Sequence, residues 1–508
     1  MKTRIILLCI FLLVFQACTR KTPNDTLVIA IEADVKNLDP RFATDAYSQR
    51  VIELIYSGLV RLNENAEIAP DLAEKWDMTD DKTYVFYLRK GILFHDGNPI
   101  TLTDIKYTFD TLRDEKVKSP HRAAFSKISE IKTEEPNKLI ISLNDVHAGF
   151  LMDLVVARIV PAHLDNLETK NLNENPVGSG PYKFKERKNN KIILEAVSSH
   201  FWRTPQLKKL EIQTVLDNTT RIALLKSKKV DLVQNALPAE SIGLLEKDEN
   251  LYIKKIPSLS YKYLGFNLRD PILKKEKVRR AIAHAINSKD LIEYLMEGLA
   301  ISSTGPLSPR SPYYEGKVDN YPYDKKKAMT LLDEAGYPAL SGENNRFSLE
   351  FKTSTDQEAV KIAKAIANQL KEVGIDVKVQ PYEFTTFMAD LAKGNFQMFS
   401  LIWVGGALLE PDIFHYIFHS SMMPPNGANR GFYENKIVDE LLERGRKTVE
   451  LDKRKGIYAQ VQKIVVQELP YVSLWHPVYF AVAHKDIQGL NLWSSGSFVP
   501  LMDCYKVR

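Results

Sequence analysis

Cysteine is scarce in this chain, which has three among its 508 residues. Cys9 and Cys18 lie close to the N-terminus, and Cys504 is the one cysteine in the rest of the sequence. A disulfide in the mature chain would have to join Cys504 to Cys18. If Cys18 is engaged otherwise, a fold of this size must rest on its hydrophobic core alone.

Motifs of the common enzyme classes are also missing. Neither Gly-x-Ser-x-Gly nor His-Glu-x-x-His occurs, and the sequence reveals no base partner for Cys504. Gly178-Ser179-Gly180 is similar to a phosphate-binding loop, but no Lys-Ser/Thr follows, and Pro181 would stop the helix that such a loop needs. We therefore expect no catalysis, no nucleotide site and no cofactor.

Charge of one sign is not in large excess. The chain has 69 basic and 64 acidic residues, a formal charge of +5. Residues 1–17 contain Lys2 and Arg4 and no acid, so their removal would lower the charge by two, to +3. This surplus favours neither nucleic acid nor a strongly acidic ligand as a partner. The hydrophobic share of 44% and the length are typical of a soluble protein with two or three domains.

Long apolar runs are missing as well. The run from Ile5 to Phe15 is too short for a permanent membrane-spanning helix. Because Lys2 and Arg4 precede it, the run is typical of a secretory signal peptide. We therefore expect an exported protein whose residues 1–17 are removed.

The end of this run is similar to the lipobox of bacterial lipoproteins, whose cysteine carries the lipid. Ala17-Cys18 matches that motif, whereas Phe15 and Gln16 depart from its usual residues. Several acyl chains on one cysteine would anchor the protein stably, since each buried methylene adds about 0.8 kcal/mol. We expect lipidation of Cys18, a tether over residues 18–25, and anchoring in the periplasm or at the cell surface. Cleavage elsewhere, with an unmodified Cys18, is the alternative.

The most informative stretch runs from Pro70 to Leu112. Residues 83–89 have the period of a half-buried strand, with one side made by Tyr84, Phe86 and Leu88 and the other by Thr83, Val85, Tyr87 and Arg89. Gly91 and Asp96-Gly97 predict turns on either side of a second short strand over residues 92–95.

A helix should follow this pair of strands. Thr101 and Asp104 stand at the spacing of a capping box at a helix start. Ile105, Phe109 and Leu112 then form one apolar stripe. An ordinary strand, turn and helix of any α/β domain would explain this pattern equally well.

Three motifs in this stretch are more specific. Residues 70–76 read PDLAEKW, residues 88–99 read LRKGILFHDGNP, and residues 101–104 read TLTD. In this order and register they resemble the family 5 extracellular solute-binding proteins, the peptide- and nickel-binding receptors of bacterial ABC importers. The motif NPVGSGPYKF over residues 175–184 is similar to a chain crossing in the same family.

The resemblance implies an α/β, two-lobed periplasmic-binding-protein (Venus-flytrap) fold with an extra inserted domain. Strands and helices that alternate from residue 347 to residue 403 are in keeping with such a fold. The expected limits are 26–52, 177–263 and 480–508 for lobe I, 53–176 for the inserted domain, and 264–479 for lobe II. Closure of the lobes around a ligand is the motion that this fold implies.

The resemblance also places a binding segment at residues 401–414, LIWVGGALLEPDIF. In peptide receptors of the family, a strand ends in Trp, an Asp three residues later pairs with the ligand's α-ammonium, and an acidic-Pro pair follows. Trp403 and Glu410-Pro411 match, but Gly406 stands at the Asp position. A desolvated ammonium needs a charged partner, so Glu410 or Asp412 is the substitute that the sequence offers.

Main-chain contacts would not depend on side-chain identity. The family's cleft segments bind an extended ligand by a form of β-strand addition. The residues that match those segments are Ala43, Thr44, Asp45 and Ala46, followed by Trp403, Val404, Gly405 and Gly406. A plain core position is the alternative for Trp403, because large aromatic side chains are usually buried.

His415 and His419 are spaced to share one face of a helix. With Glu410 and Asp412 close by in sequence, they are the candidate ligands of a metal or metal chelate, as the nickel receptors of the family suggest. A helix turn in a cleft wall is the alternative. No metal site is assigned on this pattern alone.

The expected function is capture of an extracytoplasmic oligopeptide and its delivery to a membrane permease and its ATPase. A nickel or metal-chelate receptor is the alternative within the family, and a surface hydrolase or adhesin is the alternative of another class. We expect a monomer without nucleic-acid partners.

Overall fold

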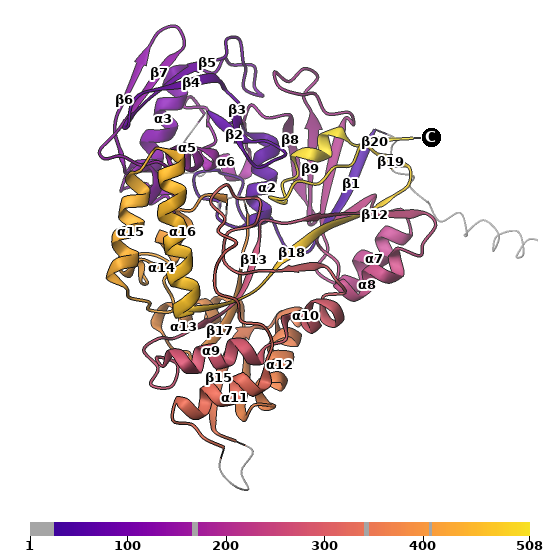
Figure 1. Cartoon of the computed structure of the whole chain (residues 1–508). Coiled ribbons are helices and arrows are strands. Elements are labelled where there is room, and N and C mark those ends of the chain that lie inside the picture. The colour runs from indigo at the N-terminus through magenta and orange to yellow at the C-terminus, as the bar shows by residue number, and fades with distance from the viewer. Residues whose placement is uncertain (1–24, 165–170, 340–344, 406–408, 508) are drawn as a thin grey trace, which may run out of the picture.

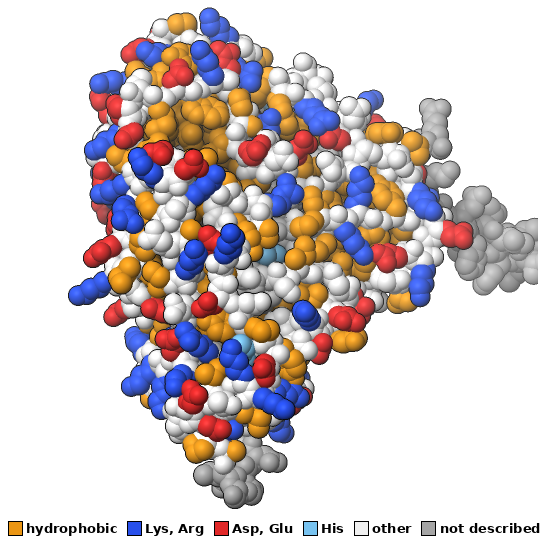
Figure 2. Space-filling view, viewed as in Figure 1, with side chains coloured by type: hydrophobic (Ala, Val, Ile, Leu, Met, Phe, Trp, Pro, Cys, Tyr) orange, Lys and Arg blue, Asp and Glu red, His pale blue; other side chains and the backbone are white. Residues whose placement is uncertain are grey.

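The structure is a computed structural model, and it describes residues 25–164, 171–339, 345–405 and 409–507. The predicted signal peptide, Cys18 and Gly406 lie outside these residues. No helix among the described residues is both long and apolar enough to cross a membrane. Figure 2 shows basic and acidic side chains intermixed over one face, as the small net charge predicts.

Within the described residues, the main sheet has twelve strands and extends through both halves of the molecule (Figure 1). Ten strands follow one path and two more pair with β18. The path is β16 (Ile375–Tyr382), β15 (Phe347–Ser354), β17 (Met398–Trp403), β13 (Tyr261–Phe266), β18 (Tyr471–His484), β11 (Leu232–Gln234), β1 (Thr26–Ile31), β10 (Lys209–Thr214), β9 (Lys191–Ala196) and β8 (Tyr182–Lys188), and the two others are β12 (Leu251–Pro257) and β14 (Ala300–Ser302).

β18 joins the two halves. Its first part pairs with β13 and β14, and its second part pairs with β12 and β11. We call the half with β1 and β8–β12 lobe I, and the half with β13–β17 lobe II. The chain also crosses between β12 and β13, where the Ser260 hydroxyl bonds the Tyr479 hydroxyl at 2.6 Å and the Ser260 carbonyl accepts from His476 at 2.9 Å. The crossings are therefore fixed side by side, as a hinge requires.

A separate four-stranded sheet lies in residues 53–176, which we call the inserted segment. Its order is β4 (Ala73–Asp80), β5 (Thr83–Leu88), β7 (Lys138–Leu143) and β6 (Ile128–Glu134). Two further antiparallel pairs join β2 (Val60–Leu62) to β3 (Ile68–Pro70) and β19 (Ile487–Gln488) to β20 (Tyr505–Lys506). The limits expected for the lobes and the inserted domain stay predictions.

The predicted strand and helix of the inserted segment are confirmed. β5 covers residues 83–88, and Thr101 and Asp104 form the capping box of α3 (Leu102–Arg113), whose Ile105 and Phe109 are fully buried. The strand expected over residues 92–95 was wrong: only an isolated bridge joins Leu93 to Pro99, because the Asp96-Gly97 turn leaves too few residues for a ladder.

Helices cover both faces of the main sheet and one face of the small one (Figure 1). Besides α3 they are α2 (Ala46–Ile55), α4 (Arg122–Phe125), α5 (Phe150–Asp153), α6 (Asn171–Glu174), α7 (Asn218–Lys226), α8 (Ala239–Leu245), α9 (Glu276–Ala285), α10 (Ser288–Asp290), α11 (Lys325–Glu334), α12 (Gln357–Lys371), α13 (Phe384–Lys393), α14 (Ile413–Phe418), α15 (Lys436–Lys447) and α16 (Leu451–Glu468). Shorter turns are η1 (Leu154–Val156), the π-helix η2 (Leu291–Leu295), η4 (Ser420–Met422) and η5 (Val499–Asp503).

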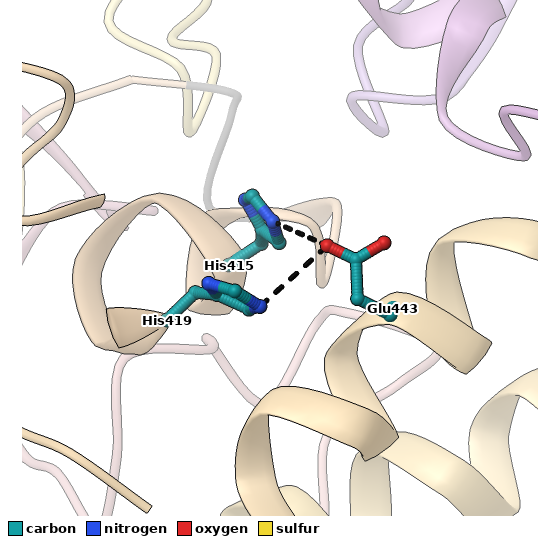
Figure 3. Close-up of side chains that lie close together, drawn as sticks. All are labelled: His415, His419 and Glu443. Carbon is teal, nitrogen blue, oxygen red and sulfur yellow. Dashed lines mark hydrogen bonds and ion pairs between the residues drawn. The ribbon is translucent and has the colours of Figure 1, made fainter. Parts of the chain in front are cut away.

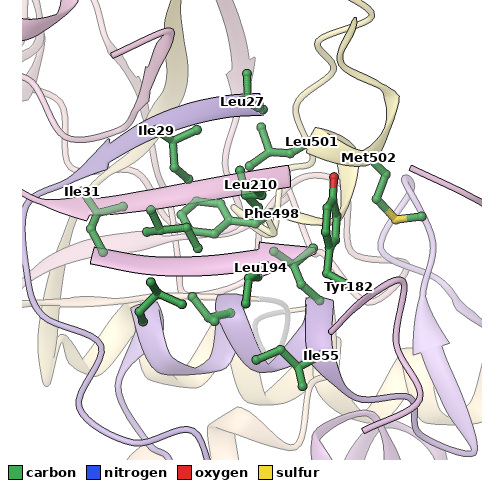
Figure 4. Close-up of a cluster of buried hydrophobic side chains, with 14 of the residues drawn as sticks. Leu27, Ile29, Ile31, Ile55, Tyr182, Leu194, Leu210, Phe498, Leu501 and Met502 are labelled. Carbon is green, nitrogen blue, oxygen red and sulfur yellow. The ribbon is translucent and has the colours of Figure 1, made fainter. Parts of the chain in front are cut away.

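Each lobe has a core on both faces of its strands. In β1, Leu27, Ile29 and Ile31 pack with α2 and the C-terminal tail (Figure 4), whereas Val28 and Ala30 pack against α7 and α8. Strand β13 of lobe II likewise contributes to two clusters, one with α9, α11 and α12 and one with α13–α16. Burial on both faces explains why these strands are apolar almost throughout.

Candidate ligand-binding site between the lobes

The carboxyl ends of the central parallel strands meet between the lobes. β1 runs between β10 and β11, and β15 runs between β16 and β17, all in parallel pairs. In both places the connections leave to opposite faces of the sheet. In open α/β sheets, ligands commonly bind at strand ends with this arrangement. Glu32 directly follows β1, and Asp356 follows β15.

One edge of β17 is open at its carboxyl end. Its pairing with β15 stops at Phe399, whereas its pairing with β13 continues to Trp403. The Asn267 N–H donates to the Gln397 carbonyl at 2.9 Å, so in an alternating ladder the odd-numbered residues bond β13. The main-chain groups of Ile402 therefore point to the opposite edge, where no strand of the described residues covers them.

The side chains at this strand end form a half-open aromatic corner. Trp403 packs edge-on against Tyr416, with ring centroids 6.1 Å apart, and the Arg430 guanidinium lies 5.5 Å from the Trp403 ring. The indole is half-buried, and Val404 beyond it is 45% exposed. Gly405 has φ +104°, which turns the chain away from the strand.

Charged side chains from both lobes lie near one another beyond the strand ends. The Glu32 carboxylate accepts from the Tyr47 hydroxyl at 3.3 Å and lies 3.9 Å from Arg221, yet its side chain is 48% exposed. Burial raises the pKa of Glu32, and the Asp356 charge acts in the same direction. Burial likewise raises the pKa of Glu358, against the charge of Lys262. The two lobes therefore lie close enough for their carboxylates to repel.

Direct contacts hold the lobes together on two sides of this space. On one side, Lys361 of α12 bonds Glu240 of α8 at 2.7 Å. On the other, the Ala148 N–H of the inserted segment donates to the Arg446 carbonyl of α15 at 2.9 Å, and Lys447 pairs with Asp145 at 2.7 Å. Figure 1 shows α15 and α16 extending to the inserted segment near α5. These contacts join lobe II to lobe I and to the inserted segment.

Glu410 and Asp412, the expected substitutes for the ammonium partner, both pair with arginines. Glu410 pairs with Arg454 of α16, and Asp412 Oδ1 lies 3.0 Å from Arg446 Nε. Burial raises the pKa of Glu410 to about 7, although the Arg454 charge opposes this. These carboxylates line the contact of lobe II with the inserted segment.

In the two predicted cleft segments, residues 43–46 and residues 403–405 differ in how far their main chains are exposed. The first segment is largely engaged within the protein. Ala43 is buried and its carbonyl accepts from His121 at 2.9 Å, whereas Thr44 is exposed. Asp45 caps α2 by accepting the Ser48 N–H at 2.9 Å, and Ala46 is the first residue of that helix. Main-chain groups are therefore more open at the end of β17 than at residues 43–46.

His415 and His419 do come together. Their rings stack with centroids 4.5 Å apart, and both turn toward Glu443 of α15 (Figure 3). His415 is buried and its Nε2 lies 3.1 Å from Glu443 Oε1.

The comparisons with known proteins decide the family. Residues 67–424 match the model of a protein family described as "Bacterial extracellular solute-binding proteins, family 5 Middle". The chain belongs to family 5 of the bacterial extracellular solute-binding proteins. The glutathione-binding protein GsiB of Shigella boydii serotype 4 is 30% identical over 93% of both chains, and that of Escherichia coli K12 is 29% identical over the same shares.

Solved structures show the same fold. NikZ from Campylobacter jejuni, in complex with Ni(L-His), is 28% identical, with a TM-score of 0.83 and coverage of 96% of this chain and 100% of that one. DppA from Helicobacter pylori, in complex with the peptide STSA, is 28% identical, with a TM-score of 0.82 and coverage of 95% and 98%. The predicted two-lobed α/β periplasmic-binding-protein fold is confirmed.

The family membership also establishes the general function. This family 5 protein is the substrate-binding receptor of an ABC importer, with a permease as its partner, and it is exported to the cell envelope. Its relatives are solute-binding proteins, which carry their ligands without chemical change.

Sequence reasoning missed the charged residues at the lobe boundary. Glu32 could have been found, because it follows an apolar strand directly and strand carboxyl ends are common ligand positions. Lys262 also gave a signal, as a lone cation inside the apolar run SYKYLGF. Glu358 gave none, since acidic residues in the first turn of a helix are ordinary.

Proposed function

We propose that the solute is a short peptide, bound in extended form by main-chain groups at the open edge of β17. The observation that carries the proposal is the unpaired edge at Ile402, beside the half-open corner of Trp403. A peptide placed there would add one strand, and its main-chain amides would complete bonds that the protein leaves unmade. The predicted residues Trp403, Val404 and Gly405 belong to this proposed site.

The relatives support a peptide as the ligand class. GsiB is named for glutathione, which is itself a tripeptide, and the DppA structure holds the peptide STSA. NikZ holds Ni(L-His), which has no peptide backbone to extend a sheet. The open strand edge therefore favours a peptide over a metal chelate.

A binding panel tests this proposal. The protein without residues 1–17, stripped of carried ligand by unfolding and refolding, is titrated with glutathione, a set of tri- and tetrapeptides, and Ni(L-His). We expect at least one peptide to bind in the micromolar range or tighter, and to lose about tenfold or more in affinity when its alternate amides are N-methylated. Binding of Ni(L-His) alone, or equal affinity for the methylated peptide, would contradict the proposal.

We further propose that Cys18 carries the membrane anchor. The support is the Ala17-Cys18 end of the predicted signal peptide. Replacing Cys18 with Ser should move the exported protein from the membrane fraction to the soluble fraction almost completely, because the lipid would be its attachment. Cell fractionation with Cys504→Ser as the matched control measures this. If both variants stay with the membrane, the anchor is not at Cys18.

A further inference from the structure

His415, His419 and Glu443 form a compact group with an arrangement suited to a metal ion (Figure 3). One ligand atom from each lies within 4.8 Å of the other two. Glu443 Oε1 lies 3.1 Å from His415 Nε2 and 3.5 Å from His419 Nε2. In a tetrahedral zinc site, with bonds of about 2.0–2.1 Å, neighbouring ligand atoms are about 3.3 Å apart. Two of the three spacings are therefore already close to those of a bound ion.

A fourth candidate ligand completes the arrangement. Asp439 lies one turn before Glu443 on α15, as His415 lies one turn before His419 on the opposing segment. Asp439 Oδ1 is 3.9 Å from His419 Nε2. Two segments thus present two ligands each, and the two carboxylates supply the charge that balances a divalent cation.

The surroundings orient these ligands. The Ser421 backbone N–H donates to His419 Nδ1 at 3.1 Å, and Ser421 Oγ lies 2.7 Å from the same atom, so the ring is held with Nε2 toward Glu443 and Asp439. Ser420 donates its N–H and hydroxyl to Asp439 at 3.0 and 2.6 Å. Outer partners of this kind fix the orientation of ligand side chains in metal sites. The Glu443 side chain is 48% exposed, which gives an ion access from solvent.

One cation already lies beside the group. Arg446 Nη1 is 3.0 Å from His415 Nε2, and its Nε is 3.0 Å from Asp412. A metal at His415 would require the guanidinium to withdraw toward Asp412, where an ion pair already holds it. Asp412 would stay paired with Arg446, and only the end of the Arg446 side chain would move.

We propose that His415, His419 and Glu443, with Asp439, bind one zinc ion. The donor set of two imidazoles and carboxylates suits zinc and excludes magnesium and calcium, which prefer oxygen ligands alone. The four residues belong to α14, its C-cap and α15, and none belongs to β17, so the site is not part of the proposed peptide position and goes beyond the proposed function. The bound ion would brace the segment that follows the Trp403 loop against α15.

The test is zinc binding by the protein without residues 1–17, after treatment with a chelator and desalting. Calorimetric titration with zinc chloride, and metal analysis after a second desalting, should show one ion per chain. His419→Ala and Glu443→Gln should each weaken zinc binding about tenfold or more. His163→Ala is the matched control, since His163 also pairs with a carboxylate, Asp96, at 2.8 Å and should retain full affinity.

A cobalt titration gives a second readout. The wild-type protein should develop the strong visible absorption of tetrahedral Co²⁺, and His419→Ala should not. If His419→Ala fails to fold, Glu443→Gln still provides the test. The Glu443 side chain is half-exposed, so this substitution should leave the fold intact. Absence of retained zinc in the wild type, or equal zinc affinity in Glu443→Gln and His163→Ala, would overturn the proposal. Neither outcome depends on which peptide the receptor binds.

Discussion

Replacing Ile402 with Pro should lower peptide affinity by about 10–100-fold while the protein stays folded. Proline removes the Ile402 N–H, which points to the open edge of β17 and not to β13. No bond of the β13–β17 ladder is therefore lost, whereas a buried peptide carbonyl would lose its donor at a cost of about 1–3 kcal/mol. Calorimetric titration with a peptide from the binding panel measures the change.

Ile402→Val is the matched control, because it keeps the N–H and removes one methylene from a side chain that is 43% exposed. Its affinity should stay within a few-fold of the wild type. A thermal unfolding curve shows whether the proline variant keeps its native stability. If a well-folded Ile402→Pro protein binds peptide as tightly as Ile402→Val, the ligand does not pair with this edge.

Replacing Arg454 with Met should destabilise the protein by about 3–5 kcal/mol at pH 8, because it leaves the Glu410 carboxylate buried without its partner. The two side chains are only 3% and 15% exposed, and Arg454 also donates to Tyr313 and Gly445. Asp412 adds a like charge near Glu410. Urea denaturation at pH 8 measures the loss.

The loss should shrink as the pH falls. Burial already raises the pKa of Glu410 to about 7, and loss of Arg454 raises it further. A carboxyl group whose pKa is higher in the folded than in the unfolded state binds its proton on folding, so stability falls as pH rises from about 4.5 through the folded pKa. At pH 5.5 the variant should therefore regain much of its stability. The double variant Arg454→Met with Glu410→Gln should regain stability at pH 8, because it has no buried carboxylate at this position. If the single and the double variant lose the same free energy of unfolding at pH 8 and at pH 5.5, this account is contradicted.

The parts that the sequence predicted well depend on residues close together in the chain. The Thr101 cap and the buried stripe of α3 are settled within one helix, and β5 follows from alternation over six residues. The alternating strands and helices of lobe II likewise appear in the order that the sequence indicates. Local periodicity and capping are sufficient for these elements.

The binding site depends on contacts that no local pattern contains. The open edge of β17 exists because its pairing with β15 ends at Phe399, which only the sheet order reveals. Glu410 and Asp412 look available in the sequence, but the arginines that pair with them lie more than thirty residues later, on α15 and α16. Long-range partners of this kind decide which charged residues remain free for a ligand.

The His415–His419 pair shows the same limit. Their spacing predicted that they could share one face, and the structure brings the rings together. Glu443 and Asp439, which complete the proposed zinc site, come from the next helix and could not be selected among the many acidic residues nearby. The motif therefore indicated a surface but not the set of ligands.

The most direct test of the account is amide hydrogen exchange at residues 400–405, with and without a saturating peptide. If an extended peptide adds to β17 between the closed lobes, the Ile402 and Val404 amides should become strongly protected, and a segment on the far side of lobe II, such as α11, should not change. Unchanged exchange at residues 400–405, in a protein saturated with peptide, would show that the ligand is held elsewhere.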